Sequence, residues 1–119
     1  MVAVPEPLRL LFVCSRARRR SATAEALFAT VPDVEAMAAG TASDADVPID
    51  ADAVAWADVI LAMENVHRER LNRRFGPLLR SKRLIVLGIA DRYDFMDDEL
   101  VRLLRDRVAR SLPDVVTRL

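Results

Sequence analysis

The 119-residue chain contains one cysteine, one histidine and three glycines, and aromatic residues make up only 5% of it. A single cysteine excludes an internal disulfide framework and a multi-cysteine zinc site. No hydrophobic run approaches the roughly 20 residues that a membrane span needs. The first seven residues also lack the basic segment with which a signal peptide begins. We therefore expect a cytoplasmic protein with a free thiol, no metal site and no membrane partner.

The charge of the chain is balanced, since 18 basic and 18 acidic side chains give a formal net charge of zero. This balance argues against a protein that binds nucleic acid over its whole surface, although it says nothing about local patches. Apolar residues make up 52% of the chain, which is typical of a globular protein rather than a disordered one. At this length we expect residues 1–119 to form one domain, after an irregular leader over residues 1–7 that contains two prolines.

Apolar strand patterns alternate with helical patterns along the chain. We expect strands over residues 8–13, 34–39, 58–63 and 83–87. We expect helices from Ser21 to Pro32, from the cap Asp50 to Trp56, over residues 64–75 and in an apolar stripe that ends at Leu112. The third helix should end before Gly76 and Pro77. This alternation predicts a three-layer α/β/α fold with a four-stranded parallel sheet.

The ends of the first and last strands hold the residues of chemical interest. Ligands of such sheets bind at the carboxyl ends of the strands. Cys14 directly follows the first expected strand, and the loop over residues 88–96 follows the last. Topology therefore places the thiol and this loop on one rim, with Asp91 the first candidate for a catalytic acid and Asp94 the second.

The segment from Cys14 to Ser21 leads from a strand through a short loop into a helix N-terminus. Such a loop is an anion site, and its field favours thiolate over thiol. Five residues separate Cys14 from Arg20, whose planar guanidinium can grip two oxygens of a phosphate. These features suggest attack of the thiolate on phosphorus, with a hydroxyl from Ser21 stabilising the sulfur as a leaving group and a carboxylate serving as acid and base. The single histidine, His67, lies in a charged helix and is expected at the surface.

Several segments together resemble the low-molecular-weight protein tyrosine phosphatases. Residues 13–21 resemble the phosphate loop of that family, with Cys14, five residues, Arg20 and Ser21 near the N-terminus. Residues 39–41, Ala-Gly-Thr, are similar to the family's Ser-Ala-Gly-Thr segment, and residues 57–64 resemble its third-strand region. Residues 91–93, Asp-Arg-Tyr, match its Asp-Pro-Tyr motif. The resemblance extends from about residue 8 to residue 112.

The resemblance implies a role for each matching residue. Cys14 would be the nucleophile, Arg20 the phosphate clamp, and Asp91 the general acid and then the base. Ser21 would assist the thiolate. The other residues expected to bind substrate are those of the loop and of the substrate entrance: Ser15, Arg16, Ala17, Arg18, Arg19 and Tyr93.

The loop departs from the family's pattern at several positions. Arg16 stands where a glycine or another small residue is usual, and Ala17 stands where an asparagine usually holds the loop by hydrogen bonds. That asparagine tolerates a left-handed backbone, which alanine does poorly. Arg19 replaces a second cysteine, Ala22 replaces a proline, and the region over residues 41–58 is shorter than in the usual member. The loop is therefore unusually basic.

The leading hypothesis is a phosphomonoester hydrolase that needs no cofactor and acts on a phosphotyrosine-bearing protein or a small aryl phosphate, as a monomer or weak homodimer. One alternative is a phosphate- or phosphoprotein-binding module without catalysis, because Ala17 leaves the loop without its usual organising residue. Another is an arsenate reductase, although this chain has no second cysteine. A nucleic-acid-binding role for the arginine run ranks third and would require a steep salt dependence.

Overall fold

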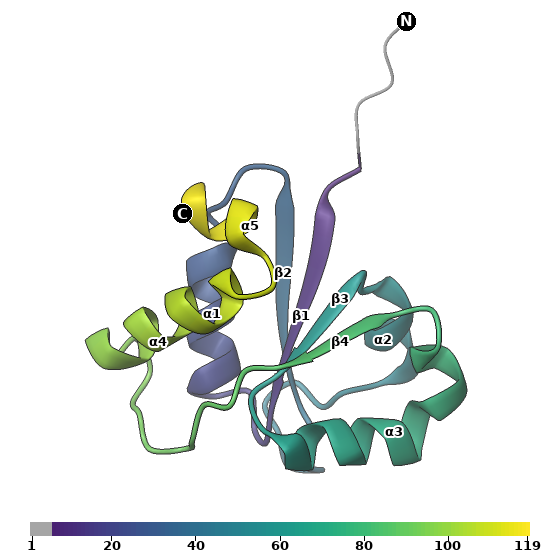
Figure 1. Ribbon diagram of the computed structural model, residues 1–119. Helices are drawn as coiled ribbons and strands as arrows, with labels where there is room; N and C mark the ends of the chain where they lie inside the picture. The colour runs from purple at the N-terminus through teal and green to yellow at the C-terminus, as the bar shows by residue number, and fades with distance from the viewer. Residues whose placement is uncertain (1–5) are drawn as a thin grey trace, which may run out of the picture.

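The computed structural model describes residues 6–119, so that most of the expected leader over residues 1–7 lies outside the described residues. Strands and helices alternate through this range (Figure 1). In chain order they are β1 (Leu8–Cys14), α1 (Arg20–Phe28), β2 (Val34–Gly40), α2 (Ala51–Trp56), β3 (Val59–Ala62), α3 (Asn65–Leu79), β4 (Arg83–Val86), α4 (Asp98–Ala109) and α5 (Pro113–Thr117).

The four strands form one parallel sheet in the order β2-β1-β3-β4. The two central strands are apolar apart from Arg9 near the start of β1, because helices cover both faces of the sheet. Cys14, the last residue of β1, pairs with Gly40, the last residue of β2. The predicted four-stranded parallel sheet and three-layer α/β/α fold are confirmed.

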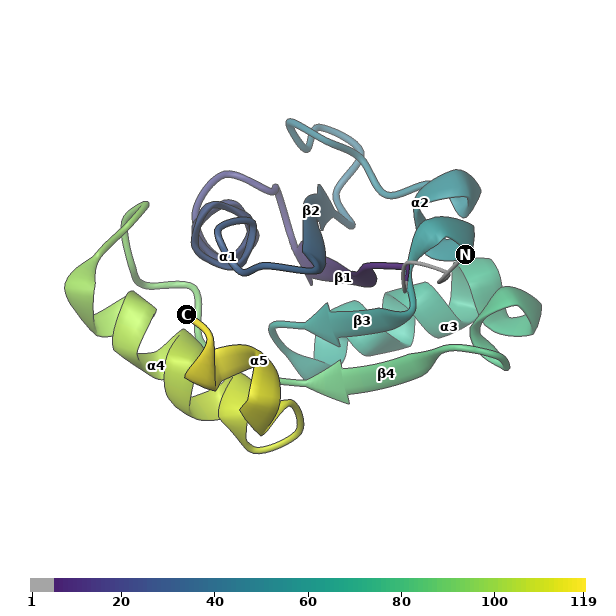
Figure 2. The same ribbon diagram turned by 90° about the horizontal axis from the view of Figure 1, so that it is seen from above.

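Helices cover both faces of the sheet. Figures 1 and 2 show α1, α4 and α5 on one side and α2 and α3 on the other. Successive side chains of β1 point to opposite faces, so Phe12 enters the core beneath α1 and α4 whereas Leu11 and Val13 enter the core beneath α2 and α3. The ring of Phe12 stacks on that of Phe28 with centroids 5.3 Å apart. These two cores fix the ends of β1 and α1, between which the candidate loop lies.

Two helix boundaries differ from the sequence prediction. α3 does not end before Gly76 and Pro77 but resumes after a break at Phe75, whose φ of −130° and ψ of 21° are not helical. Pro77 then lies in the first turn of the resumed segment, where its missing N–H costs no hydrogen bond. The C-terminal stripe does not form one helix through Leu112, because α4 ends at Ala109 and Pro113 begins the separate helix α5.

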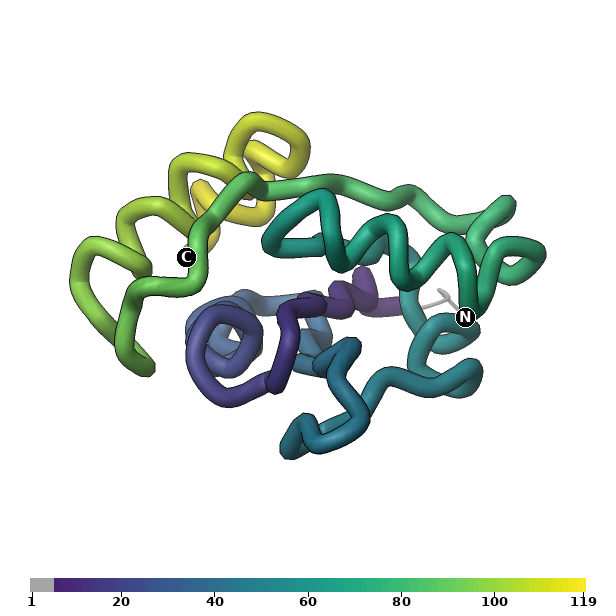
Figure 3. Tube along the Cα trace, turned by 90° about the horizontal axis from the view of Figure 1, so that it is seen from below, coloured from purple at the N-terminus to yellow at the C-terminus, as the bar shows by residue number. Residues whose placement is uncertain are grey.

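The carboxyl ends of the strands meet at one edge of the sheet. Figure 3 views this edge and shows the loop after β1, the loop after β2, the start of α3 and the loop after β4 gathered around it.

The cap predicted for α2 is present, since Asp50 accepts a hydrogen bond from the backbone N–H of Ala53 at 2.8 Å. Among residues 6–119, no helix has the length and apolar character that crossing a membrane would require.

Candidate active site

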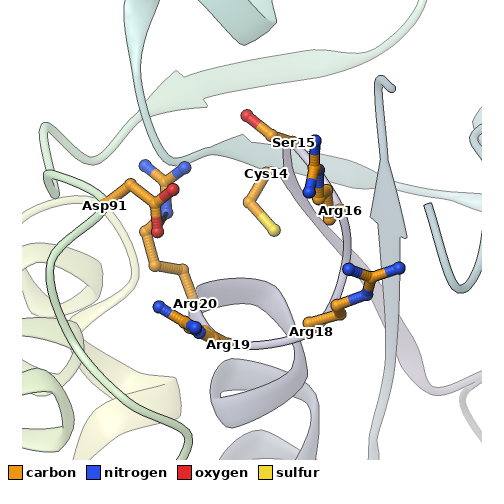
Figure 4. Close-up of a pocket in the computed structure, with 7 residues that line it drawn as sticks. All are labelled: Cys14, Ser15, Arg16, Arg18, Arg19, Arg20 and Asp91. Carbon is orange, nitrogen blue, oxygen red and sulfur yellow. Dashed lines mark ion pairs between the residues drawn. The ribbon is translucent and has the colours of Figure 1, made fainter. Parts of the chain in front are cut away.

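A cavity of about 370 Å³ opens at this edge, over the loop between β1 and α1. Figure 4 shows the sulfur of Cys14 pointing into it, with Asp91 at its side next to Arg20. Seven of the ten residues predicted from the sequence line the cavity: Cys14, Ser15, Arg16, Arg18, Arg19, Arg20 and Asp91. The fold thus brings the loop to within reach of a residue more than 70 positions further along the chain.

Two hydrogen bonds hold the sulfur of Cys14, which is 3% exposed. The backbone N–H of Ala17 donates to Sγ at 3.2 Å, and the hydroxyl Oγ of Ser21 lies 3.0 Å from Sγ in the first turn of α1. Ser21 is fully buried, so water does not compete for this contact. When the sulfur is a thiolate both groups donate to it, and they stabilise the negative form.

Arg20 is anchored beneath the cavity and is only 2% exposed. Its Nη1 donates to the carbonyl oxygen of Ile89 at 2.9 Å and forms an ion pair with Glu64 at the start of α3. Its Nε lies 3.7 Å from Oδ1 of Asp91. The guanidinium therefore links the loop between β1 and α1, which we call the phosphate loop after the resemblance, to the start of α3 and to the loop after β4.

The loop after β2 holds the outer side of the phosphate loop. The backbone N–H of Ala42 donates to the carbonyl of Ser15 at 2.8 Å, and that of Asp46 donates to the carbonyl of Arg16 at 3.0 Å. This close approach requires Gly40, because a Cβ there would lie 2.5 Å from the carbonyl oxygen of Ser15. The phosphate loop itself turns through Ala17, whose φ of +59° is in the left-handed region.

Salt bridges partly neutralise the arginines around the cavity. Arg16 pairs with Asp44 at 3.6 Å and Arg18 with Asp46 at 2.8 Å. Arg19 also lines the cavity, and no carboxylate of the described residues lies within 4.0 Å of its guanidinium. Arg19 therefore brings to the mouth of the cavity a positive charge that no neighbouring carboxylate neutralises, and this charge favours an anionic ligand.

Three predicted residues do not line the cavity. Ala17 and Ser21 lie behind the sulfur and act on it through the hydrogen bonds described above. Tyr93, expected at the substrate entrance, is 7% exposed and packs in the core beneath α1 and α4, where its hydroxyl accepts from Nε of Arg92 at 3.2 Å. Of the two carboxylates considered as acids, Asp91 lines the cavity and Asp94 does not.

The sequence analysis missed two residues at the junction of β3 and α3, His67 and Glu64. His67 was expected at the surface, but it is fully buried and its Nε2 lies 3.0 Å from Oγ of Ser15. Its Nδ1 accepts from the backbone N–H of Glu64 at 3.1 Å, as part of a capping box that begins α3. The two residues have the spacing of a capping box, but a glutamate and a histidine replace its usual Ser/Thr and Glu/Gln, so the residue types of that signal are missing from the sequence.

The imidazole of His67 is neutral at physiological pH. Burial and, to a smaller extent, the neighbouring positive charge of Arg20 together lower the pKa of His67 from 6.5 to about 4. Because Nδ1 accepts a hydrogen bond, the single ring proton sits on Nε2 and donates to Ser15. His67 and Glu64 therefore hold the loop at both ends, the first through Ser15 and the second through Arg20. Among the described residues, no group of three or more histidine, cysteine or carboxylate side chains is arranged to bind a metal.

Searches against protein-family models and curated proteins gave no match. Solved structures do match. The YwlE arginine phosphatase from Geobacillus stearothermophilus has a TM-score of 0.67 and 25% identity over 91% of this chain and 94% of that chain. The tyrosine phosphatase Wzb from Escherichia coli K30 has a TM-score of 0.69 and 21% identity over 86% and 94%. A thioredoxin-dependent arsenate reductase from Corynebacterium glutamicum has a TM-score of 0.63 and 19% identity over 96% and 64%.

These matches agree with the resemblance found in the sequence. They extend over most of the chain and include several phosphatases of the same small size class. The chain therefore has the fold of these phosphatases, a three-layer α/β/α fold like that of the low-molecular-weight protein tyrosine phosphatases.

Proposed function

We propose that the protein is a phosphomonoester hydrolase that acts through a phosphocysteine intermediate. The observation that carries this proposal is the arrangement around one sulfur: Cys14 makes two hydrogen bonds, faces a cavity lined by four arginines, and has Arg20 and Asp91 beside that cavity. A nucleophile, an oxyanion clamp and a proton donor are the three components that this reaction needs.

In the first step the thiolate of Cys14 attacks phosphorus and forms an S–P bond while the bond from phosphorus to the ester oxygen breaks. Asp91, in its protonated form, gives its proton to the departing oxygen, so that the alcohol or phenol leaves neutral. The guanidinium of Arg20 and the N-terminus of α1 stabilise the charge on the equatorial oxygens of the phosphoryl group.

In the second step water attacks the phosphocysteine. The Asp91 carboxylate takes a proton from that water, the S–P bond breaks, and inorganic phosphate forms. The electron pair returns to the sulfur of Cys14, where the hydroxyl of Ser21 at 3.0 Å stabilises the leaving thiolate. Asp91 thus regains the proton that it gave in the first step, and the cycle closes without a cofactor.

The charge of the cavity favours an aryl phosphate, such as phosphotyrosine, over phosphoarginine. Both kinds of phosphatase occur among the structural neighbours. A phosphoarginine substrate brings a guanidino group to the cavity mouth, where Arg19 already stands with no carboxylate of the described residues within 4.0 Å, whereas Arg16 and Arg18 are paired with aspartates. A phenyl ring carries no positive charge and meets no such repulsion. We therefore propose a phosphotyrosine-bearing protein or a small aryl phosphate as substrate.

The experiment is a burst assay with p-nitrophenyl phosphate. The wild type should release p-nitrophenol in a rapid burst equal to the enzyme concentration, followed by slower turnover. Cys14→Ser should abolish both phases while inorganic phosphate still binds, because Arg20 and the loop backbone remain. Unchanged turnover in this variant would refute the mechanism, and phosphate binding by a wild type without any turnover would instead favour the binding-module alternative.

Asp91→Asn tests the acid, with Asp94→Asn as its matched control. Loss of the acid should slow the first step most for substrates with poor leaving groups, such as phenyl phosphate, and least for p-nitrophenyl phosphate. A typical general acid contributes about 10²- to 10⁴-fold. If Asp94→Asn shows this dependence on the leaving group and Asp91→Asn does not, the assignment of the acid is wrong.

A further inference from the structure

A second cavity, of about 270 Å³, lies beside the loop after β2 and is lined by Thr41, Arg70, Arg73 and Arg74. The three arginines lie on one face of α3 because residues three and four apart share a face of a helix. All three are exposed. Neither the proposed reaction nor the capping of α3 uses them.

None of these arginines has a carboxylate partner within 4.0 Å among the described residues, in contrast to Arg16, Arg18 and Arg20. Arg70 donates to the hydroxyl of Thr41 at 3.2 Å, which is a neutral partner.

Nη2 of Arg74 donates to the carbonyl oxygen of Ile49 at 3.4 Å. The guanidinium carbon Cζ of Arg74 lies over the ring of Phe75, 4.9 Å from its centroid. The side chain of Arg73 makes neither a hydrogen bond nor an ion pair with residues 6–119. Three positive charges thus stand together without an ion pair to any described residue, and each disfavours the others unless an anion joins them.

This cavity is joined to the candidate active site by short connections. The backbone N–H of Thr41 donates to the carbonyl oxygen of Cys14 at 2.9 Å. His67, one helical turn before Arg70 on α3, contacts Ser15 in the phosphate loop. A polypeptide whose phosphorylated side chain enters the first cavity would therefore have neighbouring residues near the second.

We propose that Arg70, Arg73 and Arg74 form a docking site for acidic residues that flank the phosphorylated residue of a polypeptide substrate. The inference rests on the proposed function and adds to it a preference for acidic phosphopeptides. Carboxylates fit because guanidinium groups bind them in a planar, bidentate geometry. A nucleic acid fits less well, since no aromatic side chain lines the cavity to stack on a base.

The test compares two phosphotyrosine peptides that differ only in glutamate or glutamine at the flanking positions. For Arg73→Glu the KM for the glutamate peptide should rise about tenfold at low salt, because the change removes one exposed ion pair and adds a repulsion. The kcat, the KM for the glutamine peptide and the hydrolysis of p-nitrophenyl phosphate should stay unchanged. Raising the salt concentration to 1 M should remove the wild type's preference for glutamate.

Arg102→Glu is the matched control, because Arg102 is also an exposed arginine of a helix but lies on α4, across the sheet from α3 (Figure 1). It changes the net charge of the protein by the same amount. The proposal is overturned if Arg102→Glu raises the KM as much as Arg73→Glu does, since the effect would then come from overall charge. It is also overturned if the wild type hydrolyses both peptides equally at low salt.

Binding separates this proposal from the proposed function. Fluorescence anisotropy with an unphosphorylated, labelled glutamate peptide reports docking even if the protein hydrolyses no phosphoester. Docking lost in Arg73→Glu and kept in Arg102→Glu supports the site whatever the outcome of the burst assay. Tighter binding of a uridine oligonucleotide, lost in Arg73→Glu, together with no binding of the peptide, would overturn the peptide proposal and assign the cavity to nucleic acid.

Discussion

The buried imidazole of His67 should make the protein less stable as the pH falls from neutral towards 5. In the folded protein Nδ1 of His67 accepts from the N–H of Glu64, and Nε2 donates to Ser15. Protonation of Nδ1 would turn this acceptor into a donor that faces another donor. Burial first, and then the charge of Arg20, lower the pKa of His67 from 6.5 to about 4, against a raising effect of Glu64.

The direction and size of the effect follow from this pKa. Between pH 6.5 and about 4 His67 binds a proton in the unfolded chain but not in the folded chain. The contribution of the neutral His67 to the unfolding free energy is therefore fully present above pH 6.5 and is lost as the pH falls through this range. At about 1.4 kcal/mol for each unit of pKa difference, lowering the pH from 7.5 to 5.0 should cost the wild type about 2 kcal/mol of unfolding free energy.

Urea unfolding at pH 7.5 and pH 5.0 measures this loss, with His67→Gln as the comparison. The glutamine amide offers an acceptor and a donor, as the neutral imidazole does, but does not titrate. Protonation of carboxylates affects both proteins alike, so the difference between them isolates His67. The variant should lose about 2 kcal/mol less than the wild type over this interval. Equal losses in the two proteins would refute the assignment of a neutral, buried imidazole.

Two further predictions concern the backbone around the sulfur. Ala17→Gly should raise the unfolding free energy measured in urea titrations by roughly 0.5–1 kcal/mol. Glycine removes the strain of an alanine in the left-handed region, and this gain outweighs the greater freedom that glycine gives the unfolded chain. A lower stability would mean that the φ of +59° at Ala17 carries no strain. Gly40→Ala should lower the unfolding free energy by roughly 1–3 kcal/mol and weaken the binding of inorganic phosphate measured by calorimetry. The added Cβ would lie 2.5 Å from the carbonyl oxygen of Ser15 and 2.6 Å from Cβ of Ala45. A variant with wild-type phosphate affinity would show that the loop after β2 does not hold the phosphate loop.

The sheet was predictable because its strands are apolar on both faces and alternate with amphipathic helices. Helix ends were less predictable. Gly76 and Pro77 are strong local stop signals, yet α3 resumes after its break at Phe75 because packing places Leu79, 8% exposed, in the core beneath α2 and α3. The local sequence indicates the conformation that a segment prefers in isolation. Whether the helix continues past Pro77 depends instead on the burial of Leu79 against the rest of the fold.

The candidate site divides in the same way. Cys14, Arg20 and Asp91 could be placed together from sequence because parallel topology brings strand ends to one rim. Tyr93 was misplaced because an aromatic side chain beside a rim can turn into the core as readily as into the cavity, and its neighbours in that core come from α1 and α4. His67 was misplaced for the opposite reason, since a polar residue in a charged helix is ordinarily exposed.

The position of His67 changes the interpretation of the phosphate loop. From sequence, Ala17 removes the side chain that usually organises this loop, and this departure motivates the alternative of a binding module whose loop binds phosphate but holds its sulfur poorly. In the structure the N–H of Ala17 still donates to the sulfur, although the methyl side chain of Ala17 can make no hydrogen bond. The loop is held by its neighbours instead: Glu64 pairs with Arg20 and His67 with Ser15 at the start of α3, and the loop after β2 donates two backbone hydrogen bonds. Because the same helix carries the proposed docking arginines, contacts made on α3 and the geometry of the phosphate loop share one rigid element.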